Sequence, residues 1–211
     1  MKLFQNDNQL DPDVADALSE LSNVGMGKAT NALGKMMGKR ITIQTPVITP
    51  TKTDIKKLVG KFQGKLSMGI VMRLGDNLRG VVLIIIDQKF MHDLVATLTG
   101  VPYTDQQMLE DEDSLSVIKE VANIMAASFM TAISSYTGLR IYLTPVMVGV
   151  DIVEDLISYP VEKMYVNPQN CICIDTSFTV QGKKVEPHKC QGNMVIFPDD
   201  ASLEVLVGKL I

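Results

Sequence analysis

The segment ELSNVGMGKATNALGKMMGKRI, residues 20–41, returns one hundred residues later as EVANIMAASFMTAISSYTGLRI, residues 120–141. Both segments begin with Glu-x-x-Asn and end with Gly-x-Arg-Ile, in the same register. Self-similarity at a fixed offset indicates that a chain is built from repeated structural units. The sequence therefore predicts two related halves, at about residues 11–100 and 111–211.

A long helical pattern opens each half. In the first half, apolar residues follow helical spacing from Val14 onward, and Asp11-Pro12 supplies an N-cap and a first-turn proline. In the second half, an acidic run over residues 111–114 favours a helix N-terminus, and Gly138 is placed to end the helix after about Tyr136. We therefore predict two long helices, the first of which starts near residue 12.

Strands and a short helix are predicted to follow each long helix. A first strand is succeeded by a hairpin, and a short amphipathic helix closes the half. The first strands are residues 40–43 and 140–143, the hairpins turn at 75–77 and 181–184, and the closing helices include 91–98 and 203–210.

The order of these elements favours an α+β fold, because hairpin strands need no parallel crossover. We expect an internally duplicated helix-three strands-helix unit with pseudo-twofold symmetry, in which a largely antiparallel sheet packs against the two long helices. Residues 103–107 are the only obvious linker between the halves. A single intertwined domain over residues 1–211 is therefore favoured over two mobile domains.

The composition narrows the classes of function. A hydrophobic content of 46% with 21% charged residues suits a packed globular protein. A net charge of −4 argues against a nucleic-acid partner, which requires a basic surface. No apolar run reaches the roughly 20 residues of a membrane-spanning helix, and the N-terminus lacks a secretory signal. We expect no membrane association and a cytoplasmic location, which agrees with only three cysteines.

A zinc site is one alternative for part of the second half. Cys171 and Cys173 alternate along a probable strand, and His188 and Cys190 do the same further on. Thiolates and imidazole are the usual zinc ligands, but this spacing matches none of the usual structural zinc patterns. We favour small side chains in two paired strands and predict no metal site.

One polar stripe is expected on each long helix. Asp16, Glu20 and Asn23 fall within an arc of about 60° on a helix that advances about 100° per residue. Such residues are commonly just solvated, but their repetition in register in two diverged halves favours a functional role over packing or capping. The second copy of the stripe consists of Ser116, Glu120 and Asn123.

Two glycines adjoin the first stripe. Gly25 and Gly27 follow Asn23 within the helical pattern, and a missing side chain lets a helix backbone approach another molecule closely. We expect these glycines to permit a close approach of a partner.

The spacing Asp/Ser-x3-Glu-x2-Asn-x22-Pro resembles the signature of the CheC, CheX and FliY family of chemotaxis phosphatases. The first copy fits it with Pro46 as the proline, and the second ends at Pro145 with 21 residues in place of 22. Two motifs in a chain of this length resemble the arrangement of CheC, whereas CheX carries one motif and FliY adds a flagellar-switch domain.

The resemblance implies a phosphatase that hydrolyses the aspartyl phosphate of a CheY-type response regulator in bacterial chemotaxis. Asn23 and Asn123 would orient the attacking water, and Glu20 and Glu120 would pair with the active-site lysine of the receiver domain. The chain would need no cofactor of its own, because the Mg²⁺ belongs to the receiver. The supporting residues would be Asp16 and Ser116 in docking, and Pro46 and Pro145 in shaping the strand after the helix.

Three other functions stay open. The chain could be a non-catalytic adaptor that binds CheD, a partner which the resemblance also implies, or phosphorylated CheY. It could be a structural flagellar-switch component, although the additional domain is missing. A conventional hydrolase is the third, but neither His92 nor His188 lies near a nucleophile motif such as G-x-S-x-G.

Overall fold

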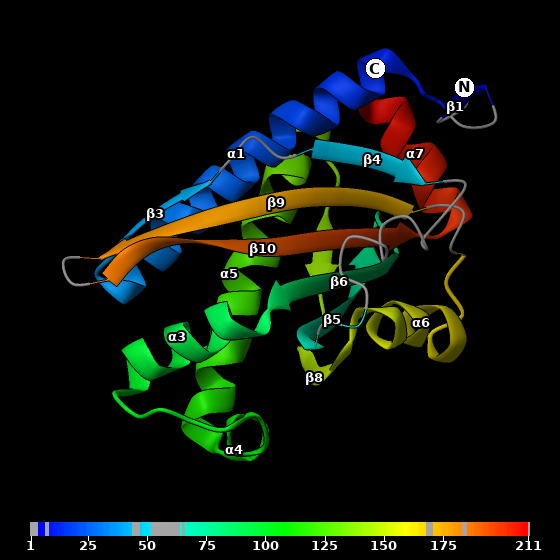
Figure 1. Ribbon diagram of the computed structural model, residues 1–211. Coiled ribbons are helices and arrows are strands. Elements are labelled where there is room, and N and C mark those ends of the chain that lie inside the picture. Colours follow the sequence, from blue (N-terminus) through cyan, green and yellow to red (C-terminus); the bar gives the residue numbers. More distant parts are fainter. Residues whose placement is uncertain are drawn as a thin grey trace.

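The protein has an α+β fold, shown in Figure 1 as a computed structural model. All strand pairs within the described residues are antiparallel. The predicted fold class, an antiparallel sheet packed with two long helices, is confirmed. The structure describes residues 4–6, 9–43, 47–51, 64, 66–167, 171–182 and 185–210.

The elements follow in an order that repeats after α3. The first half contains β1 (Phe4–Asn6), β2 (Gln9–Leu10), α1 (Pro12–Met37), β3 (Arg40–Ile43), β4 (Val47–Thr51), β5 (Leu66–Asp76), β6 (Gly80–Asp87) and α3 (Gln88–Thr99). The second half contains α4 (Asp105–Glu110), α5 (Glu112–Thr137), β7 (Ile141–Leu143), β8 (Met147–Ile152), α6 (Val153–Lys163), β9 (Cys171–Gly182), β10 (Val185–Pro198) and α7 (Asp200–Leu210).

The two long helices, α1 and α5, have the predicted ends. Each is 26 residues long, and each starts at an aspartate cap: the Asp11 side chain accepts from the Asp13 amide, and that of Asp111 from the Ser114 amide. Each helix stops at a glycine in the left-handed region, Gly38 with φ 59° and Gly138 with φ 71°. Only glycine adopts this conformation at little cost, so these two residues fix where the helices end.

The sheet interleaves strands from the two halves. Its order is β3-β9-β10-β6-β5-β7, with β4 also pairing with β9 and β8 also pairing with β5. Strands β3 and β4 of the first half therefore pair with the hairpin of the second half, and β7 and β8 pair with the hairpin of the first half. Strands β1 and β2 form a separate two-stranded sheet. The two hairpins meet at the centre, where β6 pairs with β10.

The structure contains strands and helices that were not predicted from the sequence. Strands β4 and β8 provide a fourth strand per half, and α6 lies between β8 and β9. Helix α6 was missed because no side chain caps its start at Ile152 and because Pro160 interrupts its pattern. The predicted linker at residues 103–107 is wrong, since α4 begins at Asp105 with a capping box formed by Thr104 and Gln107.

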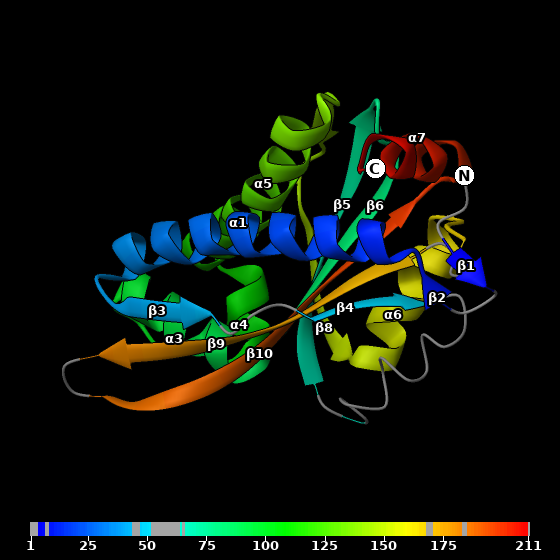
Figure 2. The same cartoon turned by 90° about the horizontal axis from the view of Figure 1, so that it is seen from above.

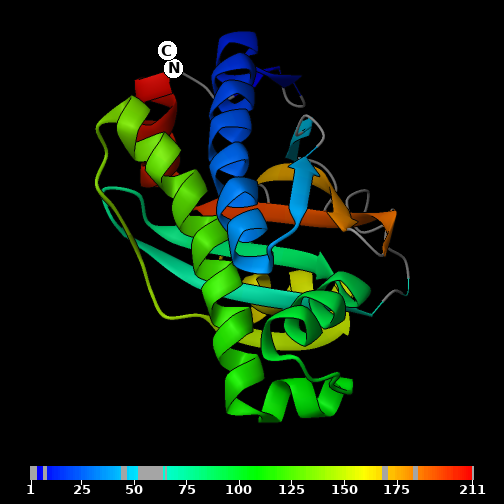
Figure 3. The same ribbon diagram turned by 90° about the vertical axis from the view of Figure 1, so that its left-hand side faces the viewer.

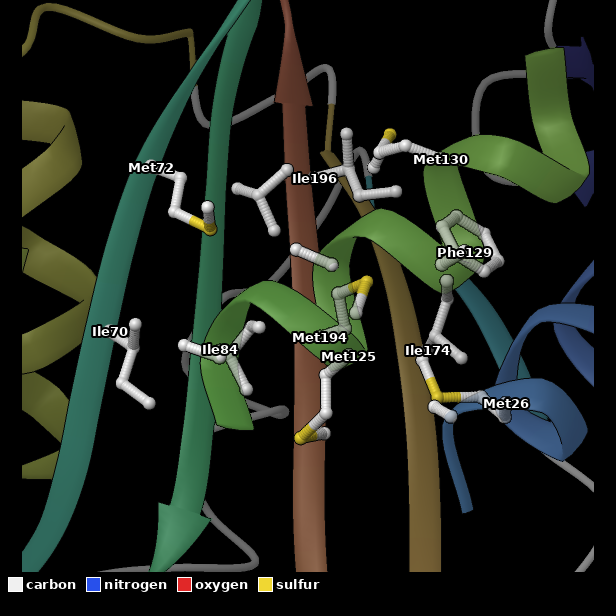
Figure 4. Close-up of a cluster of buried hydrophobic side chains, with 14 of the residues drawn as sticks. Met26, Ile70, Met72, Ile84, Met125, Phe129, Met130, Ile174, Met194 and Ile196 are labelled. Atoms are coloured by element: carbon white, nitrogen blue, oxygen red, sulfur yellow. The ribbon is translucent and has the colours of Figure 1, made fainter. Parts of the chain in front are cut away.

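Helices cover the two faces of the sheet unequally. The main core lies between one face and α1, α3, α5 and α7, as Figures 1 to 3 show from three sides. Figure 4 shows part of it, where Met26 and Met125 from the long helices pack near Ile174 and Met194 of the sheet. A smaller core on the other face packs under α6. Side chains alternate between the cores along β10 because successive residues of a strand point to opposite faces.

The zinc alternative conflicts with the register of β9 and β10. Cys173 pairs with Val195, whereas Cys190 pairs with Phe178, five residues further along β9. At about 3.3 Å per residue, these pairs are about 16 Å apart, too far for ligands of one zinc ion. Cys171 and Cys173 are instead buried in the smaller core.

Within the described residues, α5 alone is long and apolar enough to span a membrane. Half of its apolar stretch is buried inside the fold. Its buried side chains, such as Met125 and Phe129, belong to the main core. The apolar character of α5 is therefore that of a central core helix.

Helices α1 and α5 touch at Gly25. A Cβ atom at this position would lie 2.8 Å from the Cα atom of Phe129, closer than real atoms approach. The expectation that Gly25 permits the close approach of a partner molecule is therefore wrong. Gly25 permits the close approach of α5 in the same chain. A Cβ atom on Gly27, two residues later, would meet nothing within 4 Å.

This pair of glycines gives a matched test of the helix contact. Gly→Ala in a helix interior normally stabilises a protein by about 1 kcal/mol, and we expect this from Gly27→Ala. Gly25→Ala should destabilise by about 1–3 kcal/mol, because the methyl group meets the α5 backbone. Urea unfolding followed by circular dichroism measures both free energies, and equal shifts of the same sign would contradict the contact.

A second test concerns the attachment of α4. His92 on α3 lies 2.5 Å from a carboxylate oxygen of Asp105, and this hydrogen bond holds the pKa of Asp105 below its usual value of 3.8. The charged carboxylate of Asp105 thus stabilises the folded protein at pH values above 3.8. This contribution is lost as the pH falls through the lowered pKa of Asp105. Asp105→Asn should cost at most about 1 kcal/mol at neutral pH, since the pair is partly exposed.

The pH dependence of that cost is the measurement. The unfolding free energies of the wild type and Asp105→Asn should converge as the pH is lowered from 3.8 to about 2. A difference that stays constant over this range would show that the charge of Asp105 is not involved.

Candidate functional site

The first polar stripe is exposed along one side of α1. The side chains of Asp16, Glu20 and Asn23 all face solvent. Burial of Val14 and Leu18 on the opposite side sets the rotation of the helix. The predicted arrangement of a carboxylate and a carboxamide one turn apart therefore exists at the surface.

The second stripe has the same arrangement on α5. Ser116, Glu120 and Asn123 are exposed, and Ile118 and Val121 are buried at 0% exposure on the inner side. Helices α1 and α5 have equal length and start one hundred residues apart. The stripes therefore occupy equivalent positions in the two halves.

The key side chains of both stripes are free of internal partners within the described part of the chain. Glu20 and Asn23 make no hydrogen bond or ion pair there, and the same holds for Glu120 and Asn123. An exposed carboxylate and an exposed carboxamide can thus bind groups of another molecule without breaking an existing bond. Carboxamides both donate and accept hydrogen bonds, and carboxylates attract cations.

One proline of the motif, Pro145, lies in a connection between strands and not on a long helix. Pro145 is exposed between β7 and β8, next to Thr144, whose hydroxyl accepts from the Arg73 amide at 2.8 Å. Pro46 lies outside the described residues. The one-residue contraction falls after Leu143, so it leaves the register of α5 unchanged. The second stripe is therefore built as the first one is.

One exposed apolar residue next to the first stripe was not singled out from the sequence. Val24 is 44% exposed beside Asn23, and the equivalent Ile124 is half-buried. A valine on the outer, polar side of an amphipathic helix is the signal that could have found it. It adds an apolar contact surface to the stripe.

Two cavities of the described structure lie away from both stripes. One, of about 270 Å³, lies between β5, β8 and α6, with Leu156 in its lining. The other, of about 570 Å³, is lined by Arg73, Arg79 and Tyr165. Neither is lined by a stripe residue. The stripes are convex helix surfaces, which suit contact with a macromolecule better than enclosure of a small molecule.

Known structures share this fold. FliY of Thermotoga maritima matches with a TM-score of 0.65 and 23% identity, over 95% of this chain and 98% of that one. The FliM middle domain of Helicobacter pylori matches with a TM-score of 0.59 and 10% identity, over 94% and 99% of the two chains. The chain therefore shares its fold with FliY and with the FliM middle domain.

Sequence comparisons indicate which family of proteins the chain resembles. Residues 14–49 and 114–145 match the CheC-like family, and each segment contains one stripe. The CheY-P phosphatase CheC of Bacillus subtilis (strain 168) is 27% identical over 202 residues, which are 94% of each chain. The resemblance to the CheC-type phosphatases, with two motifs in one chain, is confirmed.

A structural role for the stripes can be tested through stability. Exposed residues with no internal partner contribute little, so Glu20→Gln, Asn23→Ala, Glu120→Gln and Asn123→Ala should each change the unfolding free energy by less than about 0.5 kcal/mol. Asp111→Ala is the control and should cost about 1 kcal/mol, because it removes the α5 cap. A comparable cost at any stripe position would favour the packing or capping interpretation.

Proposed function

We propose that the chain is a phosphatase that hydrolyses the aspartyl phosphate of a CheY-type response regulator in bacterial chemotaxis. The observation that carries the proposal is an exposed Glu-x-x-Asn pair at equivalent positions of α1 and α5, within the two segments matched by the CheC-like family. Similarity over 94% of the chain to a CheY-P phosphatase supports the same reaction.

This reaction requires a correctly positioned water molecule and does not require a nucleophile from the enzyme. An aspartyl phosphate is an acyl phosphate, and the carboxylate that leaves is a good leaving group. Most of the acceleration can therefore come from holding one water molecule in line with the bond that breaks. Asn23 or Asn123 would hold this water. The carboxamide oxygen would accept a hydrogen bond from the water, and the carboxamide NH2 group would donate one to the water oxygen.

The glutamates would set the docking register. Side chains three residues apart on a helix are about 5–6 Å apart at Cβ, so Glu20 and Asn23 can reach into the same partner site. Glu20 and Glu120 would pair with the lysine of the receiver's active site, which gives specificity by electrostatic complementarity. Mg²⁺ would be bound by the receiver, and this chain would need no cofactor.

The remaining motif residues would act around this centre. Asp16 and Ser116, one turn before the glutamates, would extend the docking surface. Pro145 lies in the connection between β7 and β8 and would shape it, as Pro46 would in the first half. The cytoplasm, where chemotaxis receivers act, would be the site of the reaction.

A non-catalytic adaptor is the second candidate function. The FliM middle domain of Helicobacter pylori shares the fold at only 10% identity, so the fold alone does not require catalysis. In this role the chain would bind phosphorylated CheY or CheD without hydrolysing the phosphate. The presence of both Glu-x-x-Asn pairs favours the phosphatase.

The decay of phosphate on a Mg²⁺-loaded CheY-type receiver from the same organism tests the proposal. The wild type should accelerate decay, and Asn23→Ala or Asn123→Ala should each remove a part of the acceleration. The double variant should lose about a hundredfold or more, as expected when the residue that orients water is lost. Its circular dichroism spectrum and its binding to the receiver should match those of the wild type.

The adaptor function makes a different prediction for the same experiment. Tight binding of the phosphorylated receiver by the wild type with no acceleration of decay would overturn the phosphatase proposal.

A further inference from the structure

We propose that the two stripes face opposite sides of the helix pair, so that one chain binds two phosphorylated receivers at the same time. This inference rests on the proposed function and deepens it. It concerns the number of receivers bound and the independence of the two sites, which neither the motif nor the family similarity specifies.

The direction of the first stripe follows from Gly25. A Cβ atom on Gly25 would point straight at the α5 backbone, so this side of α1 faces α5. At about 100° per residue, Asp16 lies about 180° around the helix from Gly25. Glu20 lies about 140° away and Asn23 about 160° away. The stripe on α1 therefore points away from α5.

The direction of the second stripe follows from the other side of the same contact. The Cα and Cβ atoms of Phe129 are within 3.4 Å of the Cβ position of Gly25, so this side of α5 faces α1. Glu120 lies about 180° around the helix from Phe129, and Asn123 about 120° away. The stripe on α5 therefore points away from α1, and the two stripes lie back to back.

The neighbouring helices leave both outer sides open. Helix α7 contacts both α1 and α5, and so does α3. Lys39, just after α1, binds Thr97 of α3 at 2.9 Å, which places α3 at the C-terminal end of α1 and away from its stripe. The side chains of Glu20 and Glu120 remain exposed.

The size of a receiver domain, compared with the width of the helix pair, decides whether both sites can bind a receiver at the same time. Packed helices have axes about 8–10 Å apart, and a helix with side chains is about 10–12 Å wide, so the two outer surfaces are about 20 Å apart. A domain of roughly 100 residues has a radius of gyration of about 13 Å and a diameter of about 34 Å. Two such domains on one surface 20 Å across would overlap.

Opposite directions remove this overlap. With one receiver on each side, the receiver centres would be about 50 Å apart, well beyond one diameter. The sites should then bind and turn over independently.

The stoichiometry is measured with a Mg²⁺-loaded, beryllofluoride-bound CheY-type receiver from the same organism, which mimics the phosphorylated state. Native mass spectrometry and sedimentation velocity of the wild type with excess receiver should show two receivers per chain. Charge reversal by Glu20→Lys or Glu120→Lys should reduce this to one, because each lysine would repel the receiver's lysine. Glu204→Lys, an equal change at an exposed position of α7, should leave it at two.

Steady-state kinetics give an independent readout. If the sites are independent, the kcat of the wild type equals the sum of the kcat values of Glu20→Lys and Glu120→Lys, about twofold above either when the two are equal. If one receiver blocks the other site, the wild-type kcat lies between the two single-site values. The ratio kcat/KM is additive in both cases, so it serves as the internal control.

Each outcome has one meaning. Two receivers per chain and additive kcat values support the inference. One receiver per chain with an intermediate kcat, while the wild type still accelerates decay, overturns the inference and leaves the phosphatase proposal standing. Absence of both receiver binding and acceleration overturns the proposed function and the inference with it.

Discussion

The contact between Gly25 and Phe129 fixes the arrangement on which the rest of the structure depends. Because no side chain separates the two backbones at this point, α1 and α5 pack as one unit on the sheet. The contact also fixes the rotation of each helix about its own axis. Each Glu-x-x-Asn pair is exposed because the opposite side of its helix is occupied by the other helix and by the sheet. The packing of the two helices and the exposure of both stripes thus depend on one small residue.

The duplicated sequence builds a structure in which neither half is self-contained. The edge strands of the first half pair with β9, and those of the second half pair with β5. The main core draws residues from both long helices and from all four central strands. Two equivalent surface sites are therefore carried on one shared core.

Much of this architecture could be predicted because its signals are local. Aspartate caps, terminal glycines and helical periodicity gave both ends of α1 and α5, and turn residues gave the two hairpins. The two stripes could be predicted from helical spacing alone. The phosphatase roles of their residues were inferred from the family resemblance. Helix α6 and the short strands β4 and β8 were missed because the helix lacks a side-chain cap and the strands lack clear alternation. The role of Gly25 could not be predicted, since only tertiary structure shows which backbone a glycine approaches.

The interleaved sheet has a consequence for synthesis on the ribosome. Strand β3 ends at Ile43, yet its partner β9 begins at Cys171, so well over one hundred residues must be made before the two can pair. The nascent first half has the β5–β6 hairpin, but β3 and β4 have no strand to pair with until β9 has left the exit tunnel. Pairing over such long sequence separations is slow, and unpaired apolar strands are prone to aggregation. Chaperone holding of the emerging chain would matter more here than for two halves joined in tandem.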